Sequence, residues 1–413
     1  MRQQITILLF LLMTVIGCNS SHQQAKQAAM ERWQNARARL SVDLAIQQFN
    51  SGDLKKAAAT AVSAIDINPE YTQAHLILGQ IYLEQDKLAN SRDCFEKCLE
   101  LQPDQPEAHY FLGVINQRWQ KLQPAFDHFQ AAWRFQPDRA EYLLALVNTK
   151  MAMGEPDNAL QLLTENFSTV NKTEALYATA GNIYVSLGRD DSAVEKFQQA
   201  LDINPDAWIV KESLAFSLQR CGRHNQALQY FKELDSTSGT GNTTGSDKNS
   251  DSRWIYQLAM GDCYLALKNY HQAQRCYEFV STQNASNPDL WVRLGQTQLA
   301  RQKTDRAETC AHKALALDEN NSEALLLLGY VAMKKGDYQQ GKTVCKQMIG
   351  KNDQDPLAYC MLGQCLQALG QNDEALDCYA RALQIDPDDK LAGKLLLTVQ
   401  DVSVGAKTGT SSH

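Results

Sequence analysis

A small residue flanked by larger apolar ones recurs at an interval of about 34 residues along most of the chain. The series is Ala45, Gly79, Gly113, Val147, Gly181 and Ala215, and after a longer interval Gly261, Gly295, Gly329 and Gly363. A period of this length indicates one supersecondary unit per repeat, which cannot bury its apolar face alone and is stabilised by stacking on its neighbours. The period therefore predicts a repeat array rather than a compact enzyme domain.

Two further positions keep the same phase. Twelve residues after the first position, every residue is small: Ala57, Ser91, Ala125, Ala159, Ala193, Ala227, Ala273, Ala307, Gly341 and Ala375. Four residues later the position is often aromatic, as at Phe95, Phe129 and Phe197. Helix-favouring residues dominate, which predicts two antiparallel helices per repeat. We expect the small residues of the two helices to meet, and the larger ones to fill the wedge before the next pair.

This pattern resembles the tetratricopeptide repeat. The best copies run from His75 to Tyr82 and from Tyr177 to Tyr184, and prolines recur near the repeat ends at Pro69, Pro103, Pro137, Pro205 and Pro387. The resemblance implies an all-α superhelical solenoid of antiparallel helix pairs. It places repeats 1–6 in residues 38–234 and repeats 7–10 in residues 254–389, followed by a capping helix over 390–401 and a disordered tail over 402–413.

One interval in the series is longer than the others. The step from Ala215 to Gly261 exceeds the regular period, and the excess lies in the Ser-, Thr- and Gly-rich residues 235–253. This composition does not support a packed core and predicts a flexible loop. The loop is either a tolerated surface insertion or a hinge between the two sets of repeats.

The amino terminus has the pattern of an export signal. Arg2 is followed by an apolar stretch, Ile5 to Ile16, which is shorter than the roughly 20 residues needed to span a bilayer. The stretch ends in Val15-Ile16-Gly17-Cys18, which resembles the lipobox of bacterial lipoproteins. This resemblance implies that residues 1–17 are a signal peptide, that Cys18 is lipidated, and that residues 18–37 form a lipid-anchored linker and an N-capping helix. The alternatives are an ordinary secretory signal or an uncleaved anchor.

Such a signal predicts a protein of the bacterial cell envelope, at the outer membrane or the periplasmic face. The formal net charge is −7, and no basic run points to a nucleic-acid partner. No phosphate-binding loop, dinucleotide fingerprint or nucleophile motif is present, and the eight histidines are scattered along the sequence. We therefore expect a non-enzymatic protein without a cofactor or a metal.

The cysteines leave two alternatives open. Besides Cys18 there are ten, none in a Cys-x-x-Cys pair. Two pairs, Cys263 with Cys276 and Cys365 with Cys378, have the same separation in sequence, which sets them at similar heights on the facing helices of one repeat. Each pair forms a disulfide, or all these cysteines pack as small apolar residues.

The family resemblance also implies a binding groove. In tetratricopeptide repeats the residue after the small position of the first helix points into a concave groove, and we select Gln80, Asn148, Asn182, Gln296, Tyr330 and Gln364. Carboxamides both donate and accept hydrogen bonds, so a series of them can pair with the backbone of a bound peptide. The same amides can instead be simple solvated groups. Glu212 and Asp262, the acidic residues of the groove series, have no feature that distinguishes them from solvated carboxylates.

These observations favour a scaffold that binds peptide or protein partners in the groove. One alternative is an accessory subunit of polysaccharide synthesis or export, which predicts aromatic residues in the groove such as Tyr110, Phe216 and Tyr330. Another is an accessory subunit of pilus, secretion or outer-membrane assembly machinery.

Overall fold

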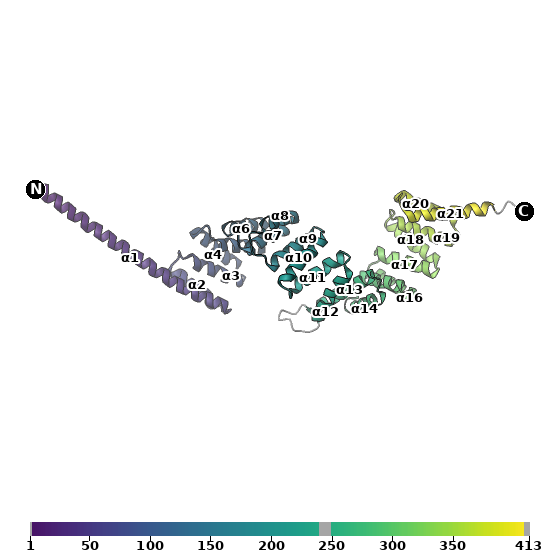
Figure 1. The fold of residues 1–413 in the computed structure, drawn as a ribbon, viewed down its shortest axis with the longest axis horizontal. Coiled ribbons are helices and arrows are strands. Elements are labelled where there is room, and N and C mark those ends of the chain that lie inside the picture. Colours follow the sequence, from purple (N-terminus) through teal and green to yellow (C-terminus); the bar gives the residue numbers. More distant parts are fainter. Residues whose placement is uncertain (1, 239–248, 409–413) are drawn as a thin grey trace. The chain divides into compact units, whose positions relative to one another are not determined.

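The computed structural model describes the backbone of residues 2–238 and 249–408, and the side chains of residues 25–236 and 253–399. These residues form helices joined by short turns (Figure 1). The chain divides into two compact units, Met1–Pro205 and Asp206–His413, which are considered separately here.

The first unit contains ten helices. They are α1 (Arg2–Asn50), α2 (Leu54–Ile67), α3 (Thr72–Glu84), α4 (Leu88–Leu101), α5 (Pro106–Arg118), α6 (Leu122–Phe135), α7 (Ala140–Ala152), α8 (Pro156–Asn166), α9 (Glu174–Ser186) and α10 (Asp190–Ile203).

The second unit contributes eleven helices within the described residues. They are α11 (Trp208–Arg220), α12 (His224–Ser238), α13 (Asn249–Ala266), α14 (Tyr270–Gln283), α15 (Pro288–Ala300), α16 (Thr304–Leu317), α17 (Ser322–Lys335), α18 (Tyr338–Lys351), α19 (Pro356–Ala368), α20 (Asn372–Ile385) and α21 (Lys390–Thr408).

Each unit is a stack of antiparallel helix pairs, as the period predicts. Within a pair the two helices pack closely, for example α5 with α6 and α15 with α16. The first helices of successive pairs are also in contact: α7 contacts α9, and α15 contacts α17. The predicted all-α solenoid architecture is therefore confirmed, and the first helices line up along one face of each stack.

The core of a pair forms where a glycine of the first helix faces a ring of the second. A Cβ atom on Gly181 would lie 2.4 Å from Phe197 Cε1, and one on Gly363 would lie 2.4 Å from Tyr379 Cε1. The small residues twelve positions later are also buried, and Ser91 Oγ donates a hydrogen bond to the carbonyl oxygen of Gly79 at 2.7 Å. The expectation that the larger side chains fill the wedge before the next pair is therefore wrong for these rings, which lie inside their own pair.

Two terminal helices are longer than the sequence predicts. α1 runs without a break from Arg2 to Asn50, so residues 18–37 are helical in this structure and continue directly into the helix of the first repeat. Residues 19–37 contain neither glycine nor proline, which explains why the helix continues into the first repeat. α21 extends to Thr408 and takes up most of the predicted tail, while residues 409–413 lie outside the described residues.

The predicted loop at 235–253 is shortened from both sides. α12 continues to Ser238 and α13 begins at Asn249, and residues 239–248 lie outside the described part. α12 packs against α13, and Asp235 accepts hydrogen bonds from Arg253 Nε at 3.1 Å and from Gln257 Nε2 at 3.0 Å. The helices on either side of the segment are therefore direct neighbours.

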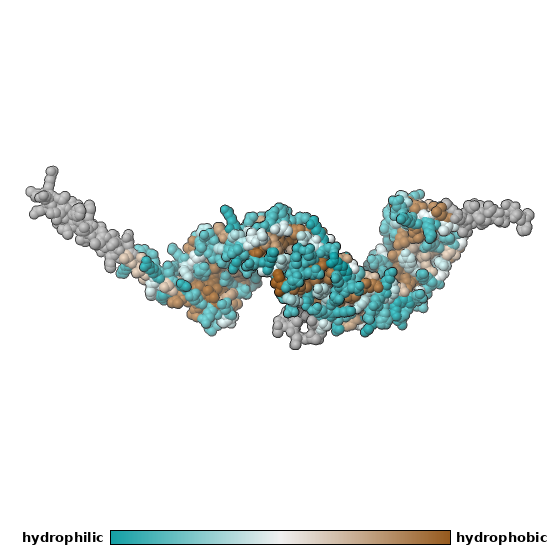
Figure 2. Space-filling model, in the orientation of Figure 1, coloured by the Kyte–Doolittle hydropathy of each residue, from teal (hydrophilic) through white to brown (hydrophobic). Residues whose placement is uncertain are grey.

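Hydrophilic residues cover most of the visible surface, with smaller hydrophobic patches between them (Figure 2). Within the described residues, no helix combines the length and the apolar character needed to cross a bilayer.

Candidate functional site

The six predicted groove residues all lie on first helices of pairs. Three belong to the first unit (Gln80 on α3, Asn148 on α7, Asn182 on α9) and three to the second (Gln296 on α15, Tyr330 on α17, Gln364 on α19). Their side chains are exposed or half-buried, although each follows a buried residue in sequence. This alternation arises because the preceding glycine or valine points into the packed interior, either against the second helix of its own pair or against the next pair.

Two of these residues meet at an apolar pocket in the second unit. The pocket has a volume of about 320 Å³ between α15 and α17, and it is lined by Gln296, Leu299, Ala300, Glu323, Leu326, Leu327 and Tyr330. Leucine and alanine side chains form most of its wall, while Gln296, Glu323 and Tyr330 are exposed. The site therefore combines an apolar recess with a few polar groups at its edge, which is the usual composition of a ligand site.

In the preceding helix pair, Asp262 is held by two neighbouring helices. Its carboxylate accepts a hydrogen bond from Tyr277 Oη at 2.7 Å and forms an ion pair with the guanidinium of Arg293. Burial raises the pKa of the Asp262 carboxyl, and the charge of Arg293 opposes that effect. Asp262 is therefore not the solvated carboxylate that the sequence suggests: it ties α13, α14 and α15 together.

Glu212, the other acidic residue of the groove series, is also engaged. It shares a hydrogen bond with Tyr256 on α13, and burial together with the charge of Glu212 raises the pKa of the Tyr256 hydroxyl to about 12. Both acids of the series thus serve the packing of helices.

The aromatic residues of the groove series do not form a continuous platform. In the first unit, the Tyr110 ring packs at 5.6 Å from the Phe129 ring and at 5.2 Å from the Tyr142 ring. In the second unit, Phe216 packs edge-on against Phe231 at 5.0 Å. Only Tyr330 of the three is exposed, at 39% of its surface. The aromatic lining that a sugar polymer requires is therefore weak among the described residues.

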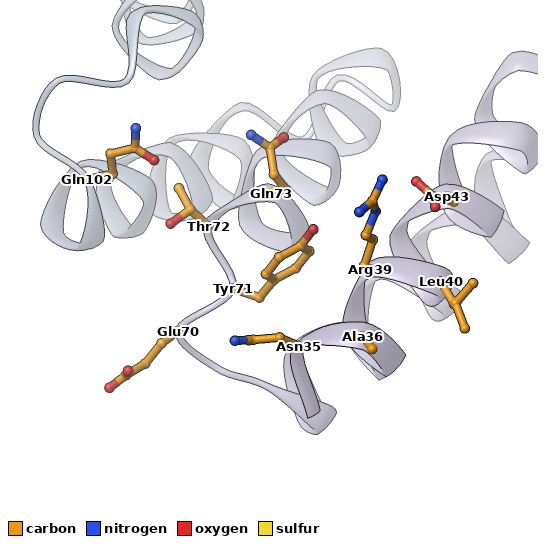
Figure 3. Close-up of a pocket in the computed structure, with 10 residues that line it drawn as sticks. All are labelled: Asn35, Ala36, Arg39, Leu40, Asp43, Glu70, Tyr71, Thr72, Gln73 and Gln102. Carbon is orange, nitrogen blue, oxygen red and sulfur yellow. The ribbon is translucent and has the colours of Figure 1, made fainter. Parts of the chain in front are cut away.

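A second depression, which sequence reasoning missed, lies in the first unit beside α1. It has a volume of about 930 Å³ and is lined by Asn35, Ala36, Arg39, Leu40, Asp43, Glu70, Tyr71, Thr72, Gln73 and Gln102 (Figure 3). It exists because α1 extends beyond the first repeat and passes the start of α3, which the repeat pattern does not reveal. Most of the residues that line it are polar or charged, so it is less suited to anchor an apolar side chain than the pocket beside Tyr330.

The cysteines of the described part are all free thiols, and most are buried. Neither predicted pair, Cys263 with Cys276 or Cys365 with Cys378, is bonded. The thiol of Cys365 instead shares a hydrogen bond with Cys345 on α18, and this contact and burial raise the pKa of Cys345. The equal spacing of the two pairs placed them at similar heights but did not determine the side-chain directions. The side chain of Cys18 lies outside the described residues.

Family comparisons agree with the repeat architecture. Models described as tetratricopeptide repeat match residues 72–105 and 175–207, residues 258–309 and 292–356, and residues 356–389. The matched segments occur in both units and follow the helix pairs described above.

Two curated proteins are similar in sequence to this chain. The chain is 25% identical over 391 residues to "Cellulose synthase operon protein C" of Pseudomonas fluorescens (strain SBW25), covering 90% of this chain and 30% of that protein. It is 23% identical over 237 residues to "Lipopolysaccharide assembly protein B" of Escherichia coli (strain K12), covering 56% of this chain and 59% of that protein. The chain thus spans less than two thirds of either relative.

Among solved structures, the APC/C hetero-tetramer Cut9-Hcn1 aligns with a TM-score of 0.45 at 12% identity, covering 91% of this chain and 94% of that chain. YrrB, described as a repeat protein of this type with an unusual peptide-binding site, aligns with a TM-score of 0.39 at 20% identity, covering 48% of this chain and 96% of that chain.

Proposed function

We propose that this chain is a non-enzymatic scaffold of the tetratricopeptide-repeat type that binds a peptide or a helix of a partner protein. The binding surface is the face formed by the first helices of the pairs. The observation that carries the proposal is the pocket between α15 and α17, where Gln296 and Tyr330 border an apolar recess.

The pocket suits one large apolar side chain of a partner. Its volume of about 320 Å³ is at the lower end of the range for ligand pockets, and burying one leucine-sized side chain contributes roughly 1.5–3 kcal/mol. The Gln296 carboxamide at the rim can donate to a peptide carbonyl and accept from a peptide N–H. Glu323, which has no ion-pair partner among the described residues, adds a negative charge beside the recess.

The test is a pull-down from a detergent-solubilised cell envelope with the wild type and two groove variants. Tyr330→Ala with Gln296→Ala removes the pocket rim in the second unit, and Asn148→Ala with Asn182→Ala removes the amides in the first. We expect a partner to be lost in at least one variant with unchanged helical content. Gln339→Ala, an amide on the second helix α18, is the matched control. Retention of every partner by both groove variants contradicts the proposal.

We also propose that the chain is anchored in a bacterial cell envelope through acylated Cys18. The support is the Val15-Ile16-Gly17-Cys18 pattern directly after the apolar stretch of the amino terminus. Two or more acyl chains are needed for stable anchoring, because each buried methylene contributes about 0.8 kcal/mol. Mass spectrometry of the purified protein is expected to show a mature chain that begins at an acylated Cys18. A Cys18→Ala chain that is processed and retained at the membrane like the wild type contradicts this.

A second candidate function is an accessory role in polysaccharide synthesis or export. It is supported by the names of the two curated relatives, which refer to a cellulose synthase operon and to lipopolysaccharide assembly. The two functions are compatible if the bound partner is a subunit of such a machine. Direct binding of sugar is distinguished by retention of the chain on immobilised glucan, with loss of retention on Tyr330→Ala.

A further inference from the structure

Two histidines face each other inside one helix pair of the first unit. His109 lies on α5 and His128 on α6, and their Nδ1 atoms are 3.3 Å apart. The ring centroids are separated by 5.6 Å with an angle of 40° between the ring planes. Both side chains are half-buried, so the pair is held by its surroundings and remains within reach of solvent.

The register of the helix pair explains why these residues meet. In the next pair the equivalent positions hold Leu143 and Leu162, which pack in one apolar cluster. In the preceding pair the same two positions hold His75 and Cys94. Among the ten repeats, His109 and His128 form the one pair with an imidazole at both positions. Their separation along the chain conceals this in the sequence, where the histidines look scattered.

A backbone contact sets the tautomer of His109. Its Nε2 lies 3.1 Å from the carbonyl oxygen of Pro103, and a carbonyl oxygen can only accept a hydrogen bond. In the neutral ring the proton is therefore on Nε2, and the lone pair is on Nδ1, which faces His128. Metal-binding histidines are oriented in the same way, by donating the other ring N–H to a carbonyl or a carboxylate.

We propose that His109 and His128 chelate one divalent transition-metal ion of the class that prefers imidazole (Ni²⁺, Cu²⁺ or Zn²⁺) through their Nδ1 atoms. Two imidazole nitrogens bound at about 2.0–2.1 Å are about 3.3–3.4 Å apart on a tetrahedral ion such as Zn²⁺, which agrees with the observed separation. On the square-planar or octahedral ions formed by Ni²⁺ and Cu²⁺ they are about 2.9 Å apart, so binding of these ions draws the two rings together by about 0.4 Å. Without metal, the Nδ1 proton of His128 lies between the two rings. On binding, that proton moves to the Nε2 of His128, and both Nδ1 lone pairs bind the ion.

The surroundings hold both rings in place. The rings sit on rigid backbone, because Ala108 and Phe129, their neighbours in sequence, are 0% and 1% exposed. Phe135 stacks on His109 at 5.8 Å and limits rotation of that ring.

The site is open, since the part of the chain that the structure describes supplies only these two ligands to it. No group of three or more His, Cys, Asp or Glu side chains suited to a metal occurs among the described residues. Water or a group from a binding partner therefore completes the coordination. The sequence-based expectation of no metal rested on the histidines being scattered, and the helix register brings two of them together.

The test uses the full chain in detergent, labelled with ¹³C at the ε1 carbon of its eight histidines, and titrated with Ni²⁺ alone. Nickel is paramagnetic and, unlike Cu²⁺, is not reduced by the free thiols. We expect the signals of His109 and His128 to broaden first, at a stoichiometry of one ion per chain. Calorimetry is expected to show at least about tenfold weaker Ni²⁺ binding for His109→Phe and for His128→Gln.

His75→Ala is the matched control. His75 occupies the position of His109 in the preceding repeat, and its Nε2 makes the same contact with a proline carbonyl, Pro69 at 2.8 Å, but no histidine faces it. We expect this variant to bind Ni²⁺ like the wild type. His109→Phe retains a ring against Phe135, so folding is preserved. Equal broadening of all histidine signals, or unchanged affinity in both variants, overturns the site and leaves adventitious surface binding only.

Discussion

Helix pairs of this protein pack in two ways around the same buried glycine. In the pair α9–α10, the space beside Gly181 is filled by the Phe197 ring of the second helix. In the pair α15–α16, the residue equivalent to Phe197 is Ala311, and Leu327 Cδ2 lies 2.4 Å from where a Cβ of Gly295 would be. Leu327 belongs to α17, the first helix of the following pair.

This difference determines what the glycine holds together. A ring from the second helix packs inside its own pair and stabilises that pair alone. An aliphatic side chain from the next pair packs between two pairs and stabilises the contact between them. Gly329 follows the second arrangement, with Met361 Cε of α19 at 2.9 Å. Leu327 also lines the pocket beside Tyr330, so this pocket lies where the ring is missing. The aromatic pairs thus supply local stability, and the aliphatic pairs supply a surface with a recess.

The largest expected effect comes from removing the ring of an aromatic pair. Phe197→Ala leaves a cavity beside Gly181, and such changes cost about 3–5 kcal/mol. Urea unfolding followed by circular dichroism measures it, with hydrogen exchange assigning the loss to α9 and α10. Ile203→Ala on the same helix, where the side chain is 49% exposed, is the control and is expected to cost less than about 1 kcal/mol. A loss of unfolding free energy for Phe197→Ala as small as that of the control contradicts the interpretation that the ring stabilises its own helix pair.

Replacing the glycine with alanine is expected to change stability less than removing the ring does, and to affect the two kinds of pair differently. In Gly181→Ala the new Cβ meets Phe197 ring atoms at 2.4–2.7 Å, which is expected to cost about 1–3 kcal/mol. In Gly329→Ala the nearest atom is the flexible end of Met361, and the better helix propensity of alanine offsets the contact, so the change is expected to be near zero.

The same denaturation curves compare these two variants directly. Combining Gly181→Ala with Phe197→Ala isolates their coupling, and we expect the alanine at 181 to cost almost nothing once the ring is gone. Equal costs for Gly181→Ala and Gly329→Ala in the otherwise unchanged chain contradict the distinction between the two arrangements.

The repeat period predicted the helix pairs and the buried small positions, because both depend only on spacing along the helices. The partner of each glycine was not predicted. Gly181 and Gly295 look alike in sequence, yet one faces Phe197 of its own pair and the other faces Leu327 of the next pair. The residue at the ring position of the second helix decides between them, and this dependence becomes visible only when the side chains are placed.

The site was predicted in part for the same reason. Gln296 and Tyr330 hold the same position in adjacent repeats, so their proximity follows from the period. The ion pair of Asp262 with Arg293 and the contact of His109 with His128 could not be inferred, because they depend on side-chain directions between helices. The depression beside α1 was missed because that helix continues beyond the repeat pattern.

Converting an aliphatic pair into an aromatic one tests whether the missing ring creates the recess. In Ala311→Phe the new ring competes with Leu327 for the space beside Gly295, and we expect the displaced Leu327 to enter the pocket that it already lines. We expect a loss of stability of about 1 kcal/mol and loss of the partner in the pull-down. Ala311→Val, which does not reach Gly295, is the control. Partner binding that survives in Ala311→Phe contradicts the link between packing and recess.

The smallest expected effect tests whether the two kinds of pair differ only in their cores. Both kinds join their helices through a residue with positive φ: Gln120 at 59° in the aromatic pair α5–α6 and Gln302 at 60° in the aliphatic pair α15–α16. A side chain in this region is strained by about 1–2 kcal/mol, while glycine adds a smaller entropic cost of about 0.5–1 kcal/mol in the unfolded chain. Gln120→Gly and Gln302→Gly are therefore each expected to stabilise their unit by up to about 1 kcal/mol, measured as a rise in thermal midpoint. Similar gains in both pairs indicate that the pairs differ only in the residue that faces the glycine. A gain in only one pair indicates that the turn also contributes to the difference between them.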